Sequence, residues 1–278
     1  MCGKLRATYD SVMPYEKQTI DELIYMVKRI LVIGAVPHKD NLKTYGGTTT
    51  LMQNFIDFCH ERNYPIFHID TFHFANKYVN AFYFAVSFLW GLLTCRVVMY
   101  NASVNGAFSL FYHTAPLAYA MRRKVVFRKY GGNFLQQMAE CPASKRLRML
   151  RLLNRASALF YETKVMVNES RKLFVHPERI HWFPNCRKPT SIALRGLGYR
   201  KRFVFISHIR EEKGVDIILD AADRLPEDFT VHLYGSIYDK KYTDDYFAGH
   251  GAEYCGPLST EEVLPTLEEF YKLKYCST

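Results

Sequence analysis

The sequence lacks several patterns that would assign it to a simple class. Its seven cysteines contain no Cys-x-x-Cys pair, and an odd, scattered set argues against a zinc site and for a reducing compartment. Residues 1–22 contain no long apolar run, so the sequence predicts no secretory signal. The uncharged aromatic stretch from Ala81 to Leu93 is shorter than the roughly 20 residues of a membrane-spanning helix. It favours a buried helix, with shallow contact with a bilayer as the alternative.

Composition and charge limit the class of protein further. The chain has 278 residues, 49% apolar and 23% charged, which is ordinary for a soluble protein of one large domain or two. Its net charge of +10 calls for an anionic partner, such as lipid headgroups, a phosphorylated substrate or nucleic acid. No recognised nucleic-acid-binding motif accompanies this charge, so we expect no nucleic-acid partner.

Apolar strand-like segments alternate with helical ones along the chain. The predicted strands are 29–34, 65–70, 97–100, 125–127, 158–161, 203–206, 230–234 and 253–255. One predicted helix begins after Gly47 and ends at about His60, a second covers 81–93, and a third ends near Met121. Further helices are predicted at 144–155, 215–224 and 260–271. Strands separated by helices imply parallel pairing with helices on both faces. The fold class is therefore α/β, with two Rossmann-like domains.

The predicted domain boundaries follow changes in composition. Residues 1–28 form an N-terminal extension, 29–186 the first domain, and 187–202 a basic, Pro-flanked linker beginning after Trp182-Phe183-Pro184-Asn185. Residues 203–278 form the second domain. Its first strand, Phe203 to Ile206, is wholly apolar and predicted to be buried on both faces.

Two cations follow this strand in the turn that leads into the next helix. Arg210 and Lys213 stand where a parallel strand ends and a helix begins. Ligands of open α/β sheets bind at that edge, and helix N-termini attract anions. The turn therefore suits a diphosphate, although a solvated turn with a local Glu-Lys pair is an equal alternative.

Three segments, in order, carry a family resemblance. They are Gly46-Gly47, Trp182-Phe183-Pro184-Asn185, and Glu212-Lys213-Gly214-Val215-Asp216. Together they resemble the glycosyltransferases of the GT-B fold, of the retaining family 4 ("group 1") type. The resemblance spans roughly residues 29 to 255 and implies a hexosyltransferase-type enzyme that moves a sugar from a nucleotide-sugar to a glycan or lipid-linked acceptor with retention. It also implies a role in polysaccharide biosynthesis.

The resemblance also implies site residues. Lys213, with Arg210 or His208, holds the donor phosphates, and the choice between the last two stays open because the family's arginine position is His208 here. Substrate contacts are implied for Gly46, Gly47, Thr48, Lys129, Gly131 and Gly132. The last three lie in the predicted loop from Arg128 to Phe134, where many relatives carry a histidine, so the catalytic residue is unknown. No metal or other cofactor is expected, apart from the nucleotide-sugar as co-substrate.

The end of the chain departs from the family pattern. Glu261 and Glu269 have the spacing of the family's glutamate pair but lie in a predicted helix, which favours coincidence. We therefore expect a second domain truncated part-way, with 272–276 pairing beside the strand at 203–206 as a shield. A non-catalytic GT-B-like remnant or binding module is the alternative function. The expected location is the cytoplasm, with peripheral contact with an anionic membrane on its cytoplasmic face as an additional expectation.

Overall fold

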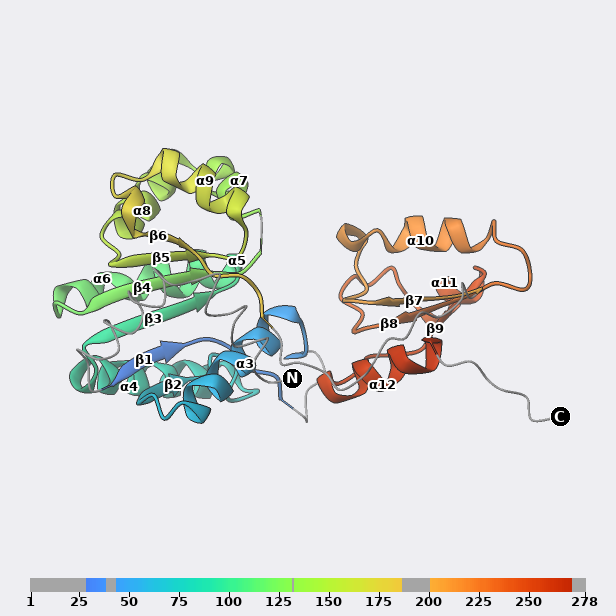
Figure 1. Cartoon of the computed structure of the whole chain (residues 1–278), viewed down its shortest axis with the longest axis horizontal. Helices are drawn as coiled ribbons and strands as arrows, with labels where there is room; N and C mark the ends of the chain where they lie inside the picture. Colours follow the sequence, from blue (N-terminus) through green and yellow to red (C-terminus); the bar gives the residue numbers. More distant parts are fainter. Residues whose placement is uncertain (1–28, 39–43, 132, 187–200, 272–278) are drawn as a thin grey trace, which may run out of the picture. The chain divides into compact units, whose positions relative to one another are not determined.

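The computed structural model describes residues 29–38, 44–131, 133–186 and 201–271, which divide into two compact units (Figure 1). The first unit comprises residues 29–36 and 51–186, and the second comprises 37–38, 44–50 and 201–271. Most of the predicted linker, residues 187–200, lies outside the described residues, as does the predicted N-terminal extension.

The first unit is built on a six-stranded parallel sheet with the order β2-β1-β3-β4-β5-β6. Its strands are β1 Ile30–Ile33, β2 Ile66–Ile69, β3 Val97–Ala102, β4 Lys124–Lys129, β5 Ala158–Tyr161 and β6 Ile180–Trp182. All six residues of β3 and all four of β5 are buried. Such continuous burial is typical of parallel strands covered on both faces.

Helices cover both faces of this sheet. They are α3 Gly47–Glu61, α4 Lys77–Thr94, α5 Val104–Gly106, a π-helical turn Ala107–Phe111, α6 Tyr112–Ala120, α7 Phe134–Glu140, α8 Ala143–Asn154, α9 Lys164–Leu173 and a 3-10 turn Pro177–Arg179. Leu31 and Ile33 share a core with Leu92 of α4, whereas Val32 shares another with Met52 of α3. Alternate residues of one strand therefore enter opposite cores, as the period of two requires.

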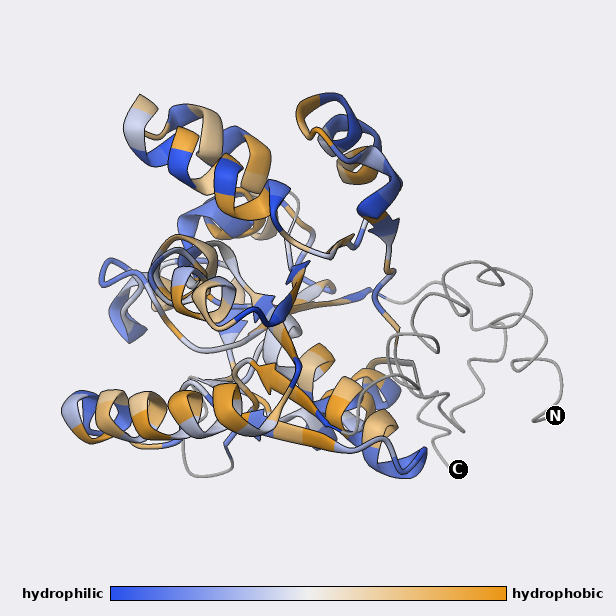
Figure 2. Cartoon of the chain, turned by 90° about the vertical axis from the view of Figure 1, so that its left-hand side faces the viewer, coloured by the Kyte–Doolittle hydropathy of each residue, from blue (hydrophilic) through white to orange (hydrophobic). Residues whose placement is uncertain are grey.

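Helix α4 keeps a long apolar face on the surface. Asn76 caps its N-terminus by accepting hydrogen bonds from the backbone N–H groups of Tyr78 and Val79. Phe88, Gly91 and Leu92 point inward, while seven large apolar side chains of the helix are exposed: Tyr78, Val79, Phe82, Val86, Leu89, Trp90 and Leu93. The hydropathy colouring in Figure 2 shows apolar and polar segments along the helices of this unit.

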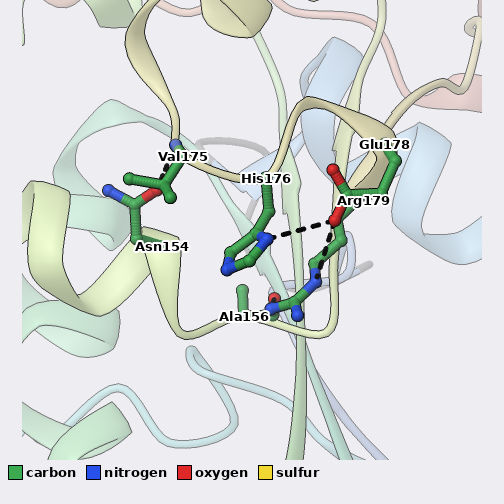
Figure 3. A network of polar contacts seen from close by, with 6 residues as sticks. All are labelled: Asn154, Ala156, Val175, His176, Glu178 and Arg179. Atoms are coloured by element: carbon green, nitrogen blue, oxygen red, sulfur yellow. Dashed lines mark hydrogen bonds and ion pairs between the residues drawn. The ribbon is translucent and has the colours of Figure 1, made fainter.

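A small polar network fixes the chain where it enters β6 (Figure 3). The side-chain oxygen of Asn154, at the end of α8, accepts a hydrogen bond of 2.8 Å from the backbone N–H of Val175. His176 and Arg179 both contact Glu178, at 3.1 and 3.8 Å. These contacts surround the 3-10 turn and so set the position at which β6 begins.

The second unit has a three-stranded parallel sheet with the order β7-β8-β9. Its strands are β7 Arg202–Ile206, β8 Thr230–Tyr234 and β9 Ala252–Tyr254, and its helices are a 3-10 turn Glu211–Lys213, α10 Val215–Ala222, α11 Asp244–Ala248 and α12 Thr260–Tyr271. Leu233 packs with Val215 and Leu219 of α10, while His232 and Tyr234 contact Phe270 of α12. Figure 1 shows α10 and α12 on opposite sides of this sheet.

The predicted fold class, α/β with parallel Rossmann-like sheets, is confirmed. The elements at 158–161, 230–234 and 260–271 have the predicted bounds, because each is a clear apolar run or helical repeat between polar turns. Helices α7 and α9 were not predicted. Strand β6, which ends at Trp182, was not predicted either, because a three-residue strand gives little signal in sequence.

Two further predictions need correction. Arg128 and Lys129 were placed in a loop, but both are buried residues at the end of β4, because pairing with β3 and β5 extends the strand through two charged positions. Phe203 to Ile206 are not buried on both faces: Phe203 is 39% exposed, and the other three are partly buried. The reason is that β7 lies at an edge of its sheet in the described part of the chain. Its predicted partner, 272–276, lies outside the described residues.

Candidate functional site

The carboxyl ends of β7 and β8 meet in the second unit. The backbone N–H of Ser207 donates to the carbonyl of Tyr234, and the N–H of Ile209 donates to that of Ser236. Gly235 has a φ of 148°, and a β-carbon there would overlap the carbonyl oxygen of Ser207, so this close approach requires glycine. The two turns that follow these strands therefore form one surface, at the sheet edge where α/β proteins bind ligands.

His208, Arg210 and Lys213 come together on this surface. Burial lowers the pKa of His208 most strongly, and the nearby positive charges of Arg210 and Lys213 lower it further. The His208 ring packs edge-on against Tyr238 with centroids 4.6 Å apart, and the Arg210 guanidinium lies 5.3 Å from the same ring. The structure thus gathers the three residues that the sequence assigned to phosphate binding.

The two cations differ in how they are held. Arg210 is partly buried, stacks on Tyr238, and makes an ion pair of 3.3 Å with the exposed Glu212. Lys213 is exposed, and within the described part of the chain no acidic side chain lies within ion-pair distance of its ammonium. Lys213 is therefore more available to bind an anionic ligand than Arg210, whose charge is partly neutralised by Glu212.

Acidic side chains near this cluster other than Glu212 are engaged elsewhere. The backbone N–H of Glu211 donates to Asp239 at 2.7 Å, which holds the turn before α10 against the turn after β8. Lys241 donates to Asp216, in the first turn of α10, at 2.7 Å, and lies 3.5 Å from Glu211. The hydrogen bond from Lys241 is the main reason that the pKa of Asp216 is lowered. This pairing compensates the carboxylate nearest the start of α10.

Gly46 lies directly against His208, and both belong to the second unit. A β-carbon on Gly46 would lie 2.9 Å from the His208 Nε2 atom, whereas one on Gly47 would meet nothing within 4 Å. The hydroxyl of Thr49 donates to two carbonyls of the preceding turn, at 2.7 and 3.0 Å, and so fixes it. Thr48 is partly buried in the first turn of α3. A side chain at Gly46 would therefore collide with His208, whereas a β-carbon at Gly47 would point into open space.

A second polar cluster lies at the carboxyl ends of β4 and β5 in the first unit. The Lys129 side chain is fully buried and donates to the carbonyl of Tyr130; burial lowers its pKa to about 8, while the charge of Glu162 opposes that shift. Glu162 accepts hydrogen bonds of 2.9 Å from the backbone N–H of Gly131 and from the side chain of Asn185. Gly131 has a φ of 87°, which glycine tolerates. Lys129 and Gly131 are therefore bound internally, and Gly132 lies outside the described residues.

Other residues at these edges were not identified from the sequence. Glu162 directly follows β5, and Tyr238, Asp239 and Lys241 follow β8 within seven residues. The only feature of the sequence that could have identified these residues is their position just after a predicted strand. Single polar residues in turns are too common for that position alone to predict a site. Glu261 and Glu269, the pair with the family's spacing, are both exposed on α12.

Comparisons with known proteins identify the fold. No family model matches the sequence, and no curated protein matches it either. Among solved structures, Anabaena HepE in complex with UDP and glucose is 13% identical, with 84% of this chain and 70% of that chain covered and a TM-score of 0.53. HepE in complex with UDP-glucose is 12% identical, with 83% and 69% covered and a TM-score of 0.53. At this identity the likeness shows a shared fold.

No helix in the described part of the chain combines the length and the apolar character needed to cross a bilayer. Helix α4 comes nearest in length, with 18 residues, yet it lies along a sheet and buries Phe88, Gly91 and Leu92 in the protein core. The prediction of a buried helix was therefore only partly right, because one face of α4 packs in the core while its other large apolar side chains are exposed.

Proposed function

We propose that this protein is a glycosyltransferase of the GT-B type that transfers a hexose from a nucleotide-sugar. The observation that carries the proposal is the convergence of His208, Arg210 and Lys213 at the carboxyl end of β7, in a fold shared with a protein whose structure holds UDP-glucose. The proposal includes the retaining family 4 chemistry that the three sequence segments resemble.

In the proposed donor site, cationic side chains stabilise the negative charge of the leaving group. Cleavage of a sugar-diphosphate bond places negative charge on the departing phosphate, and fixed cations stabilise that charge more in the transition state than in the ground state. Lys213, whose ammonium is exposed, is the proposed principal contact with the diphosphate. Arg210 is the proposed second contact, and His208, whose lowered pKa favours the neutral form, is a hydrogen-bonding group beside it.

The glycine pair and the first-unit cluster complete the proposed site residues. Gly46 and Gly47 allow close approach of a substrate to the backbone at the start of α3, with Thr48 beside them. Lys129 is assigned a positioning role beneath Gly131, because its buried ammonium holds a backbone carbonyl next to Glu162. The proposed transfer requires no metal and no organic cofactor.

The proposed acceptor is a glycan or a lipid-linked sugar in polysaccharide biosynthesis, reached from the cytoplasmic side of an anionic membrane. The exposed face of α4 supports the membrane contact, since Phe82 is 73% and Trp90 57% exposed. Aromatic and aliphatic side chains on one face of a helix insert shallowly at a bilayer surface. Lys77 at the start of α4 and Arg96 just after its end supply flanking positive charges.

Titration of the purified chain with UDP-, GDP- and ADP-sugars tests the proposal. We expect one nucleotide-sugar to bind saturably, the corresponding free nucleoside diphosphate to compete for the same site, and the sugar to be transferred to a glycan or lipid-linked acceptor mixture. Saturable binding without hydrolysis or transfer under any condition would support the non-catalytic alternative. Absence of binding by every nucleotide-sugar would contradict the proposed transferase and would support a non-catalytic remnant.

A further inference from the structure

Three potential metal ligands lie together on one face of the second unit's sheet. Among the described residues, the side chains of His232, Glu253 and Cys255 offer one ligand atom each within 4.8 Å of one another. The sequence contains no Cys-x-x-Cys or His-x-x-x-His pattern, so this group could not be recognised before the strands were paired.

Strand register brings them together. His232 of β8 pairs with Glu253 of β9 in the parallel ladder, so the two side chains are neighbours on the same face. Cys255 follows Glu253 by two positions, which returns it to that face. Glu253 of β9, Cys255 directly after the end of β9, and His232 of β8 therefore converge on one face.

The distances match the edges of a tetrahedral zinc site. His232 Nδ1 lies 3.3 Å from a Glu253 carboxylate oxygen and 3.7 Å from the Cys255 sulfur. With metal–ligand bonds of about 2.0 Å to N and O and about 2.3 Å to S, tetrahedral ligand–ligand edges are about 3.3 Å for N and O and about 3.6 Å for N and S. Both measured edges involve the same atom, Nδ1, so the imidazole is already turned toward its two partners.

The surroundings suit a bound divalent cation. The His232 ring is held edge-on by Phe270 of α12, with centroids 5.1 Å apart, and its side chain is 16% exposed. The Glu253 side chain is 70% exposed, which leaves it free to close the remaining edge toward the sulfur. A carboxylate and a thiolate carry two negative charges, which balance one Zn²⁺ ion, and Arg202 is the cation that acts on His232 from β7.

We propose that His232 Nδ1, Glu253 and the thiolate of Cys255 form a binding site for Zn²⁺ or a similar borderline-soft divalent cation. The Cys255 thiol gives up its proton to solvent on binding, and water completes the coordination. The ion ties β8 to β9 beneath α12. This site differs from the expectation of no zinc drawn from the sequence, and it is independent of the proposed sugar transfer.

Cobalt substitution tests the site directly. Co²⁺ bound to a thiolate gives an intense near-ultraviolet charge-transfer band. Zn²⁺ displaces the Co²⁺ ion, and the band is then lost. We expect one Co²⁺ per full-length chain with this band in the wild type and in the control Cys186→Ser, whose exposed thiol lies outside the second unit. Cys255→Ser should lose the band, and His232→Gln should weaken Zn²⁺ binding at least about tenfold.

A measurement on the wild type alone guards against misfolded variants. Zn²⁺ should protect Cys255 from alkylation, as mapped by mass spectrometry, while leaving Cys186 reactive. A wild-type chain that binds no Co²⁺ at micromolar concentration, a charge-transfer band retained in Cys255→Ser, or equal alkylation of Cys255 with and without Zn²⁺ would each overturn the proposal. The three residues would then be a cross-strand ion pair beside a free thiol.

Discussion

Gly46 and His208 are 162 positions apart in sequence, yet a single added carbon on Gly46 would lie 2.9 Å from the His208 Nε2 atom. This distance is shorter than real β-carbon contacts, so His208 would have to move. Since Arg210 and Lys213 act electrostatically on the same imidazole, the glycine helps to define the space in front of the cation cluster.

Gly46→Ala should lower donor affinity, because the new methyl group displaces His208 from its place beside Tyr238. Gly249→Ala, also in the second unit, is the matched control, since the nearest atom to its added β-carbon lies at an ordinary contact distance of 3.7 Å, and we expect its donor affinity to be unchanged. Calorimetric titration with the nucleotide-sugar that binds the parent measures the effect. Equal affinity of Gly46→Ala and the parent would show that this contact does not serve the site.

Lys213→Ala should weaken donor binding while leaving the fold intact. Charge-assisted contacts with a phosphate contribute about 1.5–3 kcal/mol, or roughly 10- to 150-fold in affinity, whereas an exposed lysine adds little to stability. Lys240→Ala, which removes another exposed lysine of the second unit, is the control and should bind normally. If calorimetry gives the same affinity for both variants, Lys213 does not contact the phosphates.

Lys129 should impose a pH dependence on stability. Its pKa falls from the usual 10.5 to about 8 in the folded chain, so the unfolded chain binds the proton more tightly between these values. Stability therefore rises with pH from about 8 to about 10.5, by at most about 1.4 kcal/mol per pH unit. Lys129→Met should lose this rise and be more stable than the parent near pH 7. Urea unfolding at pH 7.5 and 9.5 measures both effects, and parallel pH profiles would contradict the burial argument.

The exposed face of α4 should mediate binding to vesicles. Phe82→Glu places a charge where the helix is proposed to meet the acyl chains and should reduce sedimentation with anionic vesicles at least about tenfold. Val165→Glu on α9 is the control, because Val165 is 72% and Phe82 73% exposed. Unchanged vesicle binding by Phe82→Glu, or an equal loss in both variants, would remove α4 from the proposed membrane contact.

Local sequence patterns were sufficient for much of the fold. The apolar runs at 158–161 and 230–234 and the helical repeat at 260–271 specify their own elements, because period and turn residues act over a few positions. The position of the turn from His208 to Lys213, between a strand and a helix, could also be predicted. In that turn the relevant residues are close in sequence, so they are close in any compact fold.

Contacts between distant segments needed the tertiary structure. Strand pairing draws Lys129 into β4 and buries its ammonium, although a charged residue after an apolar run predicts a loop. The nearness of Gly46 to His208, and the register that sets His232 opposite Glu253 with Cys255 two positions on, depend on how whole elements pack. Local sequence pattern indicated most of the strands and helices. Packing and register decided which side chains share a site, because a packed contact and a strand register both depend on segments that are far apart in sequence.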